Sequence, residues 1–372
     1  MSRIGPLTKG DLIEHLDLSW ATVVKLVNRM VDSGLLVKVG TAERELPVGK
    51  NSYLYDLSAS HPVAVGVDVE YALTRLVAAN IRGEVIASRT VVTKPGKSIA
   101  SLVSFLRTAI ASFLDDEVEG RLTSEGIGIG LPAFIIPFRR NIYDEVGRGL
   151  APFFSIPVRV DNNVRAYTLY CARRVEPPGD FIMTTIRTGV GCGLFLRGEI
   201  YRGEGGLSGE ISHLKVSPGG LPCRCGTRGC LETVVNENLL YEKAVTISAL
   251  QAVDLPSAGD RERKSAVLDR LFVLAKEGDP QALEIVQEAA RWLSLAYATL
   301  LVTFDVHRIY VSGHFGRAGG LLASHVQGEL KKLVDKRFGH EVSYRPIDDA
   351  GFVLGAAYLA LNNYLVPLGS LQ

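Results

Sequence analysis

The sequence predicts an α/β protein with two lobes, preceded by a small helical unit with a β hairpin. Three observations support this fold class. With 372 residues the chain is too long for one compact core, so two or three domains are expected. From residue 63 onward, short β-prone runs alternate with helical stretches, and this plan occurs twice. The first 57 residues instead show two short helical patterns followed by two β-prone runs.

Two helices are expected at the start of the chain. Thr8 is placed to cap a helix that runs through Leu16, and Asp11 at its third position completes a capping box. After a two-residue turn, Ser19 caps a second helix over residues 20–31, whose apolar residues recur at helical spacing.

A hairpin should follow the second helix, which Gly34 ends. Residues 35–39 and 52–55 read as strands around a charged loop at 41–51. Helix, turn, helix and hairpin is the layout of a winged helix-turn-helix, so residues 1–60 are predicted to be a DNA-binding domain. In its second helix the candidates to contact operator DNA are Thr22, Lys25, Asn28 and Arg29.

Two features of this unit leave an alternative open. Its first 57 residues contain seven Lys or Arg and seven acids, so the unit is neutral rather than basic. A three-helix core would also need a helix before Thr8, for which residues 1–7 are too few. Either the start codon is placed too late or the unit is curtailed. The alternative is a dimerisation or docking module that does not bind DNA.

The first lobe is predicted from strands joined by helical crossovers. The expected strands are 63–69, 73–79, 84–92, 126–132 and 158–160, with helices at 99–114 and 164–174.

The second lobe repeats the plan. The expected elements are strands at 181–186 and 194–196 around a turn at 188–193, helices at 237–250, 263–276 and 281–301, and a late strand at 308–311. Two lobes of similar plan imply a cleft between them, which is where ligands usually bind.

Composition indicates the compartment but not the partners. A net charge of +1 carries no message about partners. The longest nearly apolar run, residues 293–304, is far too short to span a bilayer, and the first twenty residues lack the apolar stretch of a signal peptide. Five cysteines, three of them clustered, fit a reducing cytoplasm. We therefore expect a cytoplasmic protein without membrane association.

One stretch has the residue types of a metal centre. His213, Cys223, Cys225 and Cys230 lie within 18 positions, and a histidine with three thiolates is a standard ligand set for structural zinc. Nearby glycines allow the tight turns that bring the ligands around one ion. The alternative is buried thiols or a disulfide.

Taken together, these motifs resemble those of the ROK family, which covers repressors, uncharacterised reading frames and sugar kinases. The resemblance runs in order along the whole chain. After the N-terminal unit it rests on Gly126–Pro132, Asn162 and Asn163, Thr188–Gly191, Gly209–His213, Cys223–Glu232 and Gly355–Ala357.

The resemblance implies an actin-like (ribonuclease H-like) two-lobed ATPase fold, a homodimer or homotetramer, a sugar site in the cleft and structural zinc on His213 and the three cysteines. It divides residues 61–372 into a lobe of about 61–165 with the C-terminal helix after 345, and a lobe of about 166–344. The sugar-binding residues that it implies are Asn162, Asn163, Glu210, His213 and Glu232. As alternatives, Asn162 caps the helix that begins at Val164, and Glu210 is a surface acid.

Several positions depart from the kinase members of the family. Asn163 stands where kinases carry the Asp that takes the proton of the sugar hydroxyl, and an amide is not a usable base. The first phosphate loop should read Asp-x-Gly-Gly-Thr, but here Asp68–Ala72 lacks both glycines and includes Glu70. The adenosine-side loop, Ser312–Phe315, keeps one of two paired glycines, and Ala133 replaces a glycine beside the sugar.

These departures favour a regulator over an enzyme. We expect no kinase activity and no bound ATP. The predicted function is a sugar-responsive transcriptional regulator, a repressor, that binds operator DNA as a dimer and a sugar or sugar phosphate as effector. The alternatives are a ROK sugar kinase and a sugar sensor that does not bind DNA.

Overall fold

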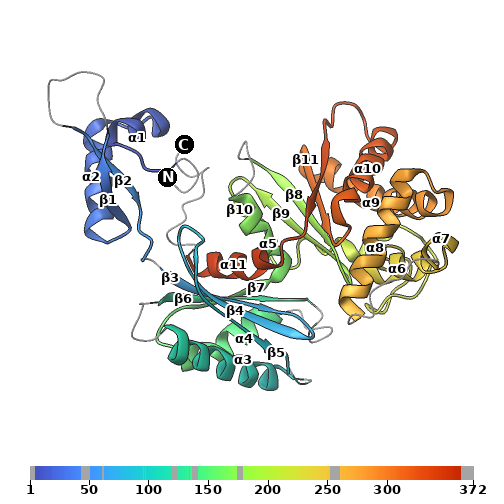
Figure 1. Cartoon of the computed structure of the whole chain (residues 1–372), viewed down its shortest axis with the longest axis horizontal. Coiled ribbons are helices and arrows are strands. Elements are labelled where there is room, and N and C mark those ends of the chain that lie inside the picture. The colour runs from blue at the N-terminus through green and yellow to red at the C-terminus, as the bar shows by residue number, and fades with distance from the viewer. Residues whose placement is uncertain are drawn as a thin grey trace. The chain divides into compact units, whose positions relative to one another are not determined.

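The computed structural model describes residues 5–42, 51–60, 63–94, 96, 98–118, 124–133, 135, 141–173, 179–251 and 260–361. The chain divides into two compact units (Figure 1). Unit 1 consists of Met1–Pro137, Ile142–Ala166 and Phe352–Val366, and unit 2 is mainly Tyr167–Gly351.

The N-terminal part of unit 1 has the expected two helices and hairpin. Its elements are α1 (Lys9–Leu16), α2 (Trp20–Asp32) and the antiparallel strands β1 (Leu36–Thr41) and β2 (Tyr53–Leu57). The capping box of Thr8 and Asp11 is confirmed, and Ser19 accepts a hydrogen bond from the backbone N–H of Thr22. A small core of Val23, Val27, Leu36 and Tyr55 holds helix and hairpin together. Residues 43–50 of the expected charged loop lie outside the described residues.

A five-stranded sheet follows in unit 1, in the order β5-β4-β3-β6-β7. Its strands are β3 (Val63–Val69), β4 (Leu73–Asn80), β5 (Val85–Val92), β6 (Ser124–Leu131) and β7 (Val158–Asn162). β3, β4 and β5 pair antiparallel, whereas β6 and β7 pair parallel. Every residue of β3 is buried, as expected for a strand covered on both faces.

Helices cover both faces of this sheet (Figure 1). On one face lie α3 (Ile99–Phe113) and α4 (Ile142–Leu150), which contact each other. Neither α4 nor the short 3-10 helix Ala151–Phe153 that follows it was expected from the sequence. On the other face lies α11 (Asp349–Ala360), whose backbone approaches β3 and β6 so closely that a Cβ at Gly66 or Gly128 would overlap a carbonyl oxygen of the helix. This packing explains glycines in the Gly126–Pro132 run without any ligand.

Unit 2 contains a second five-stranded sheet with the same plan, β10-β9-β8-β11-β12. Its strands are β8 (Phe181–Ile186), β9 (Val190–Leu196), β10 (Glu199–Ile200), β11 (Arg308–Gly313) and β12 (Glu341–Pro346). Again the first three pair antiparallel and the last two pair parallel. The turn expected at 188–193 is shorter than predicted, because β9 already begins at Val190 and pairs with β8 from there.

The helices of unit 2 form one apolar core with its sheet. They are α6 (Glu237–Ala244), α7 (Ser248–Gln251), α8 (Asp260–Glu277), α9 (Pro280–Phe304) and α10 (Gly320–Leu333). The single helix expected at 237–250 is wrong. It breaks after Ala244, where the hydroxyl of Thr246 donates to the carbonyl of Lys243 and competes with the helical backbone bonds. Of the helices in the described part of the chain, none combines the length and apolarity needed to cross a membrane.

Candidate metal centre and the residues around it

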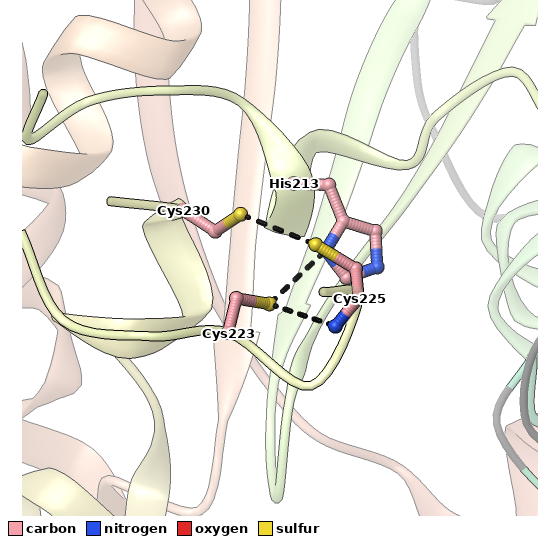
Figure 2. A group of neighbouring side chains, drawn as sticks. All are labelled: His213, Cys223, Cys225 and Cys230. Atoms are coloured by element: carbon pink, nitrogen blue, oxygen red, sulfur yellow. Dashed lines mark hydrogen bonds between the residues drawn. The ribbon is translucent and has the colours of Figure 1, made fainter. Parts of the chain in front are cut away.

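The four predicted metal ligands lie together in unit 2. His213 ends the 3-10 turn Ile211–His213, and the three cysteines come from the loop before the next 3-10 turn, Leu231–Thr233. The ligand atoms of all four residues lie within 4.8 Å of one another, and Figure 2 shows them pointing inward. The sequence prediction that these residues form one cluster is therefore confirmed.

Tight turns bring the cysteines together. The backbone N–H of Cys223 donates to the carbonyl of Thr227 at 2.7 Å, which closes the loop around Gly226 in a left-handed conformation, φ +84°. Gly229 is also left-handed, and a Cβ there would overlap the carbonyl of Ser217. Glycine is thus required at position 229, where a Cβ would overlap the backbone, and is favoured at position 226 by its positive φ.

The spacing of the donors suits a tetrahedral zinc ion. The Sγ atoms of Cys225 and Cys230 lie 3.6 Å apart, and Cys223 Sγ lies 3.6 Å from His213 Nδ1. With Zn–S bonds of about 2.3 Å, the edge of a tetrahedron would be about 3.8 Å. At 3.6 Å the sulfurs of Cys225 and Cys230 are not joined in a disulfide, so that alternative is contradicted for this pair. The donor set therefore fits structural zinc, which would cross-link the loop to the turn that carries His213.

Two adjacent thiols differ in their acidity. The hydrogen bond with Thr227 lowers the pKa of Cys225 to about 6. Burial raises the pKa of Cys223, whose thiol donates to Glu232 Oε1 at 2.8 Å. Zinc binding would therefore release a proton from Cys223, because only the thiolate is a metal ligand.

The predicted sugar residues of unit 2 adjoin this centre. His213 directs Nδ1 at the cluster and its other ring nitrogen away from it (Figure 2). Glu232 is buried, and its carboxylate accepts hydrogen bonds from Arg224 Nε at 3.1 Å and Nη2 at 2.6 Å. Although burial raises the pKa of Glu232, the bonds from Arg224 and Cys223 outweigh it, so the pKa lies below its ordinary value. Glu210, half-buried, directly precedes the turn of His213.

The predicted sugar residues of unit 1 lie where β7 runs into α5 (Asn163–Ala172). Asn162 Oδ1 accepts hydrogen bonds from the backbone N–H of Val164 at 2.8 Å and of Arg165 at 3.3 Å, so its helix-capping alternative is confirmed. Its Nδ2 donates to the hydroxyl of Tyr143 at 3.1 Å. Asn163 is the first residue of α5 and is buried.

The four predicted DNA-binding side chains are exposed on α2. Thr22, Lys25 and Arg29 share one face of the helix with Ala21 and Leu26. Asn28 is exposed as well, and its Oδ1 accepts a hydrogen bond from Lys9 Nζ at 3.0 Å. The start of α2 also exposes Trp20, at 61%, which the sequence analysis did not include among the candidates.

Comparison with known proteins identifies the family. Residues 64–363 match the ROK family, which is most of the chain. The chain belongs to the ROK family.

Relatives within the family include both enzymes and regulators. A glucokinase of Halalkalibacterium halodurans is 29% identical over 79% of this chain and 94% of its own. A putative xylose repressor of Caldicellulosiruptor sp. is 23% identical over 96% of this chain and 92% of its own. A solved ROK family transcriptional regulator, described as a homolog of the E. coli MLC protein, is 19% identical with a TM-score of 0.74, over 99% of this chain and 96% of that one. The last likeness shows the fold.

The tip of the β3–β4 hairpin contains residues 68–72, which the family resemblance aligns with a phosphate loop. In this chain the tip carries an ion-pair cluster. Asp68 and Arg75 are cross-strand partners, and Arg75 Nη1 lies 3.5 Å from Asp68 Oδ2 and 2.8 Å from Glu70 Oε1. Asp68 is fully buried. Two carboxylates therefore contact one guanidinium at this turn.

The adenosine-side loop of the ROK pattern carries a second cluster, which the sequence analysis missed. His314 Nδ1 lies 2.8 Å from Glu237 Oε1, and its Nε2 lies 3.7 Å from Asp349 Oδ1. Burial alone would lower the pKa of His314, but the two carboxylates outweigh burial and raise it to about 9. The three residues are far apart in sequence, so only an extra histidine beside Gly313 could have drawn attention to them.

Proposed function

We propose that this chain is a sugar-responsive transcriptional repressor that binds operator DNA as a dimer. The observation that carries the proposal is the extent of the matches. The glucokinase match leaves about a fifth of the chain unmatched, whereas the repressor match spans 96% of it and so extends over most of the helix–turn–helix unit. A module with two capped helices and a hairpin is of use to a DNA-binding protein and of none to a glucokinase.

On this proposal α2 is the recognition helix. Thr22, Lys25, Asn28 and Arg29 would contact DNA, with Arg29 and Asn28 suited to purine edges and Lys25 to phosphate. Trp20 is a further candidate, since an exposed indole at the start of the helix can contact a thymine methyl group. Two copies in a dimer would read two half-sites separated by a helical turn.

The effector is proposed to be a sugar or sugar phosphate. Asn162, Asn163, Glu210, His213 and Glu232 are its proposed contacts, because amides and carboxylates can bond two neighbouring hydroxyls at once. Zinc on His213 and the three cysteines would serve as scaffold by fixing the ring of His213. A sugar that binds one arrangement of the protein better than another would shift the population and change the affinity for DNA.

Binding to DNA can be tested through the chain's own tryptophans. Only Trp20 and Trp292 are present, so the Trp292→Phe variant leaves the exposed indole of α2 as the sole reporter. We expect a change in its emission, and a gel shift, with DNA from upstream of the protein's own operon.

The Lys25→Ala, Arg29→Ala double variant should bind this DNA at least about tenfold more weakly and with a smaller salt dependence. Lys332→Ala, an exposed lysine on α10, is the control. Absence of any shift by the wild type at low salt would refute the repressor proposal and favour a sensor that does not bind DNA.

The second candidate is a sugar kinase, because the glucokinase relative is more similar in sequence than the repressor. Asn163 and the Asp68–Ala72 loop argue against it, because Asn163 is not a usable base and Glu70 brings a carboxylate where the phosphates would bind. A coupled ATPase assay with a panel of hexoses decides between them. Sugar-dependent turnover by the wild type would establish the kinase.

A further inference from the structure

Backbone pairing with Cys230 places Lys215 beside the metal centre. Lys215 forms an isolated antiparallel bridge with Cys230, so the two side chains are cross-strand neighbours. Lys215 Nζ donates to Cys230 Sγ at 2.8 Å and also bonds the hydroxyl of Thr227. A surface lysine usually extends into water, whereas this one turns its ammonium group onto a predicted metal ligand.

Arg224 is linked to the metal ligands through Glu232. It stands between Cys223 and Cys225, and its guanidinium holds both oxygens of Glu232 in a forked pair. The same carboxylate contacts the sulfur of Cys223 at 2.8 Å. Once Cys223 loses its proton to bind metal, this thiolate and Glu232 would repel each other, and Arg224 is the cation placed to offset that repulsion.

The charges of the metal, its ligands and Glu232 indicate a common role for Lys215 and Arg224. A divalent ion with three thiolates and a neutral imidazole carries one net negative charge, and the adjacent Glu232 adds a second. Lys215 and Arg224 supply two positive charges in direct contact with this group. We propose that Lys215 and Arg224 are positioning residues of the zinc centre, which they hold close to electrical neutrality. This inference rests on the zinc assignment made above.

The test measures zinc retention and the cysteine–metal bond directly. Full-length protein is purified with zinc, its metal content is determined, and zinc transfer to a chromophoric chelator is followed. Lys215→Met and Arg224→Met should each lose zinc about tenfold more readily than the wild type. Lys215→Arg, which keeps a charged donor, should retain it. Lys332→Met removes the same charge from the exposed face of α10 and is the matched control.

Absorption spectroscopy distinguishes this positioning role from a general loss of folding. In cobalt-loaded protein, removing the donor to Cys230 should shift the thiolate-to-cobalt charge-transfer band of Lys215→Met to longer wavelength and leave Lys332→Met unchanged. Equal zinc retention by wild type, Lys215→Met and Arg224→Met, with an unshifted band, would overturn the inference and leave the zinc assignment standing. The same holds if Lys332→Met loses zinc as readily as Lys215→Met. Wild-type protein that contains no zinc would overturn both.

Discussion

The sheets of unit 1 and unit 2 share one strand plan, but their first hairpins contain different chemistry. At the tip of β3–β4, Arg75 pairs with Asp68 and Glu70. At the tip of β8–β9 the loop of residues 187–189 closes through a backbone bond from Arg187 to Gly189 and contains no acid. The β3–β4 turn closes differently, through a backbone bond from Glu70 to Leu73, so the two hairpins differ in turn geometry as well as in side chains. The hairpin of unit 1 is the one that departs from the Asp-x-Gly-Gly-Thr pattern expected from the family resemblance.

The two units also differ in how they are stabilised outside the sheet. Unit 2 has the loop of His213 and the three cysteines, which would gain a metal cross-link. Unit 1 depends on close backbone packing of α11 against Gly66 and Gly128. Substitutions that affect one unit should therefore leave the other intact, and hydrogen exchange of peptides from each sheet can measure this.

The largest effect is expected in unit 2 from Cys225→Ser. Loss of a thiolate ligand should abolish zinc binding and destabilise the unit by several kcal/mol, since the binding energy of a structural metal is part of the folding energy. Metal analysis and hydrogen exchange check this, with Cys171→Ala, which lies outside the cluster, as the control that keeps its zinc. Faster exchange throughout β3 and β4 would show that the units are not independent.

Next, Gly128→Ala should destabilise unit 1 by about 4 kcal/mol, because its Cβ would overlap the carbonyl of Ala356 and force α11 away from the sheet. Gly328→Ala in α10 is the matched control. A Cβ there meets no atom within 4 Å, and the change should be neutral or stabilising. Equal unfolding midpoints for the two variants in denaturant would contradict the packing argument.

A smaller loss, about 3 kcal/mol, is expected for Arg75→Met. It removes the guanidinium that lies 3.5 Å from the buried carboxylate of Asp68 and 2.8 Å from Glu70. Arg337→Met, whose partner Asp335 is exposed, should change stability by less than about 0.5 kcal/mol. Thermal unfolding of both variants provides the measurement, and a neutral Arg75→Met would show that the cluster contributes nothing to unit 1.

The smallest effect, about 2 kcal/mol, is expected for His314→Asn and should depend on pH. The folded-state pKa of His314 is raised to about 9, above the value of an unfolded histidine. Its contribution is therefore fully present below about pH 6.5 and is lost as the pH rises through about 9. Unfolding curves of wild type and variant should differ most at pH 6 and converge at pH 10. His15→Asn in α1 is the control, and a gap that stays constant with pH would refute the role of the imidazolium.

How far the sequence predicted this structure depended on the range of the signal. Thr8 and Ser19 were assigned correctly because a helix cap involves residues three positions apart. The metal ligands were found because they lie in one short stretch. By contrast, helix propensity does not predict that the hydroxyl of Thr246 bonds the carbonyl of Lys243 at the end of α6. The pairing of Arg75 with Asp68 depends on strand register, and His314 with Glu237 spans 77 positions.

The position of α11 also determines the order in which the chain can fold during synthesis. Unit 2 is nearly continuous, from Tyr167 to Gly351, and its strands and helices are all synthesised before α11 is complete. The sheet of unit 1 is made first, yet the face beside Gly66 and Gly128 has no covering helix until Ala360 has been added. A nascent chain thus carries an exposed apolar sheet face for most of its translation, which is when chaperones bind such surfaces. A chain truncated near residue 351 would contain the strands and helices of unit 2 but lack the helix that covers the sheet of unit 1.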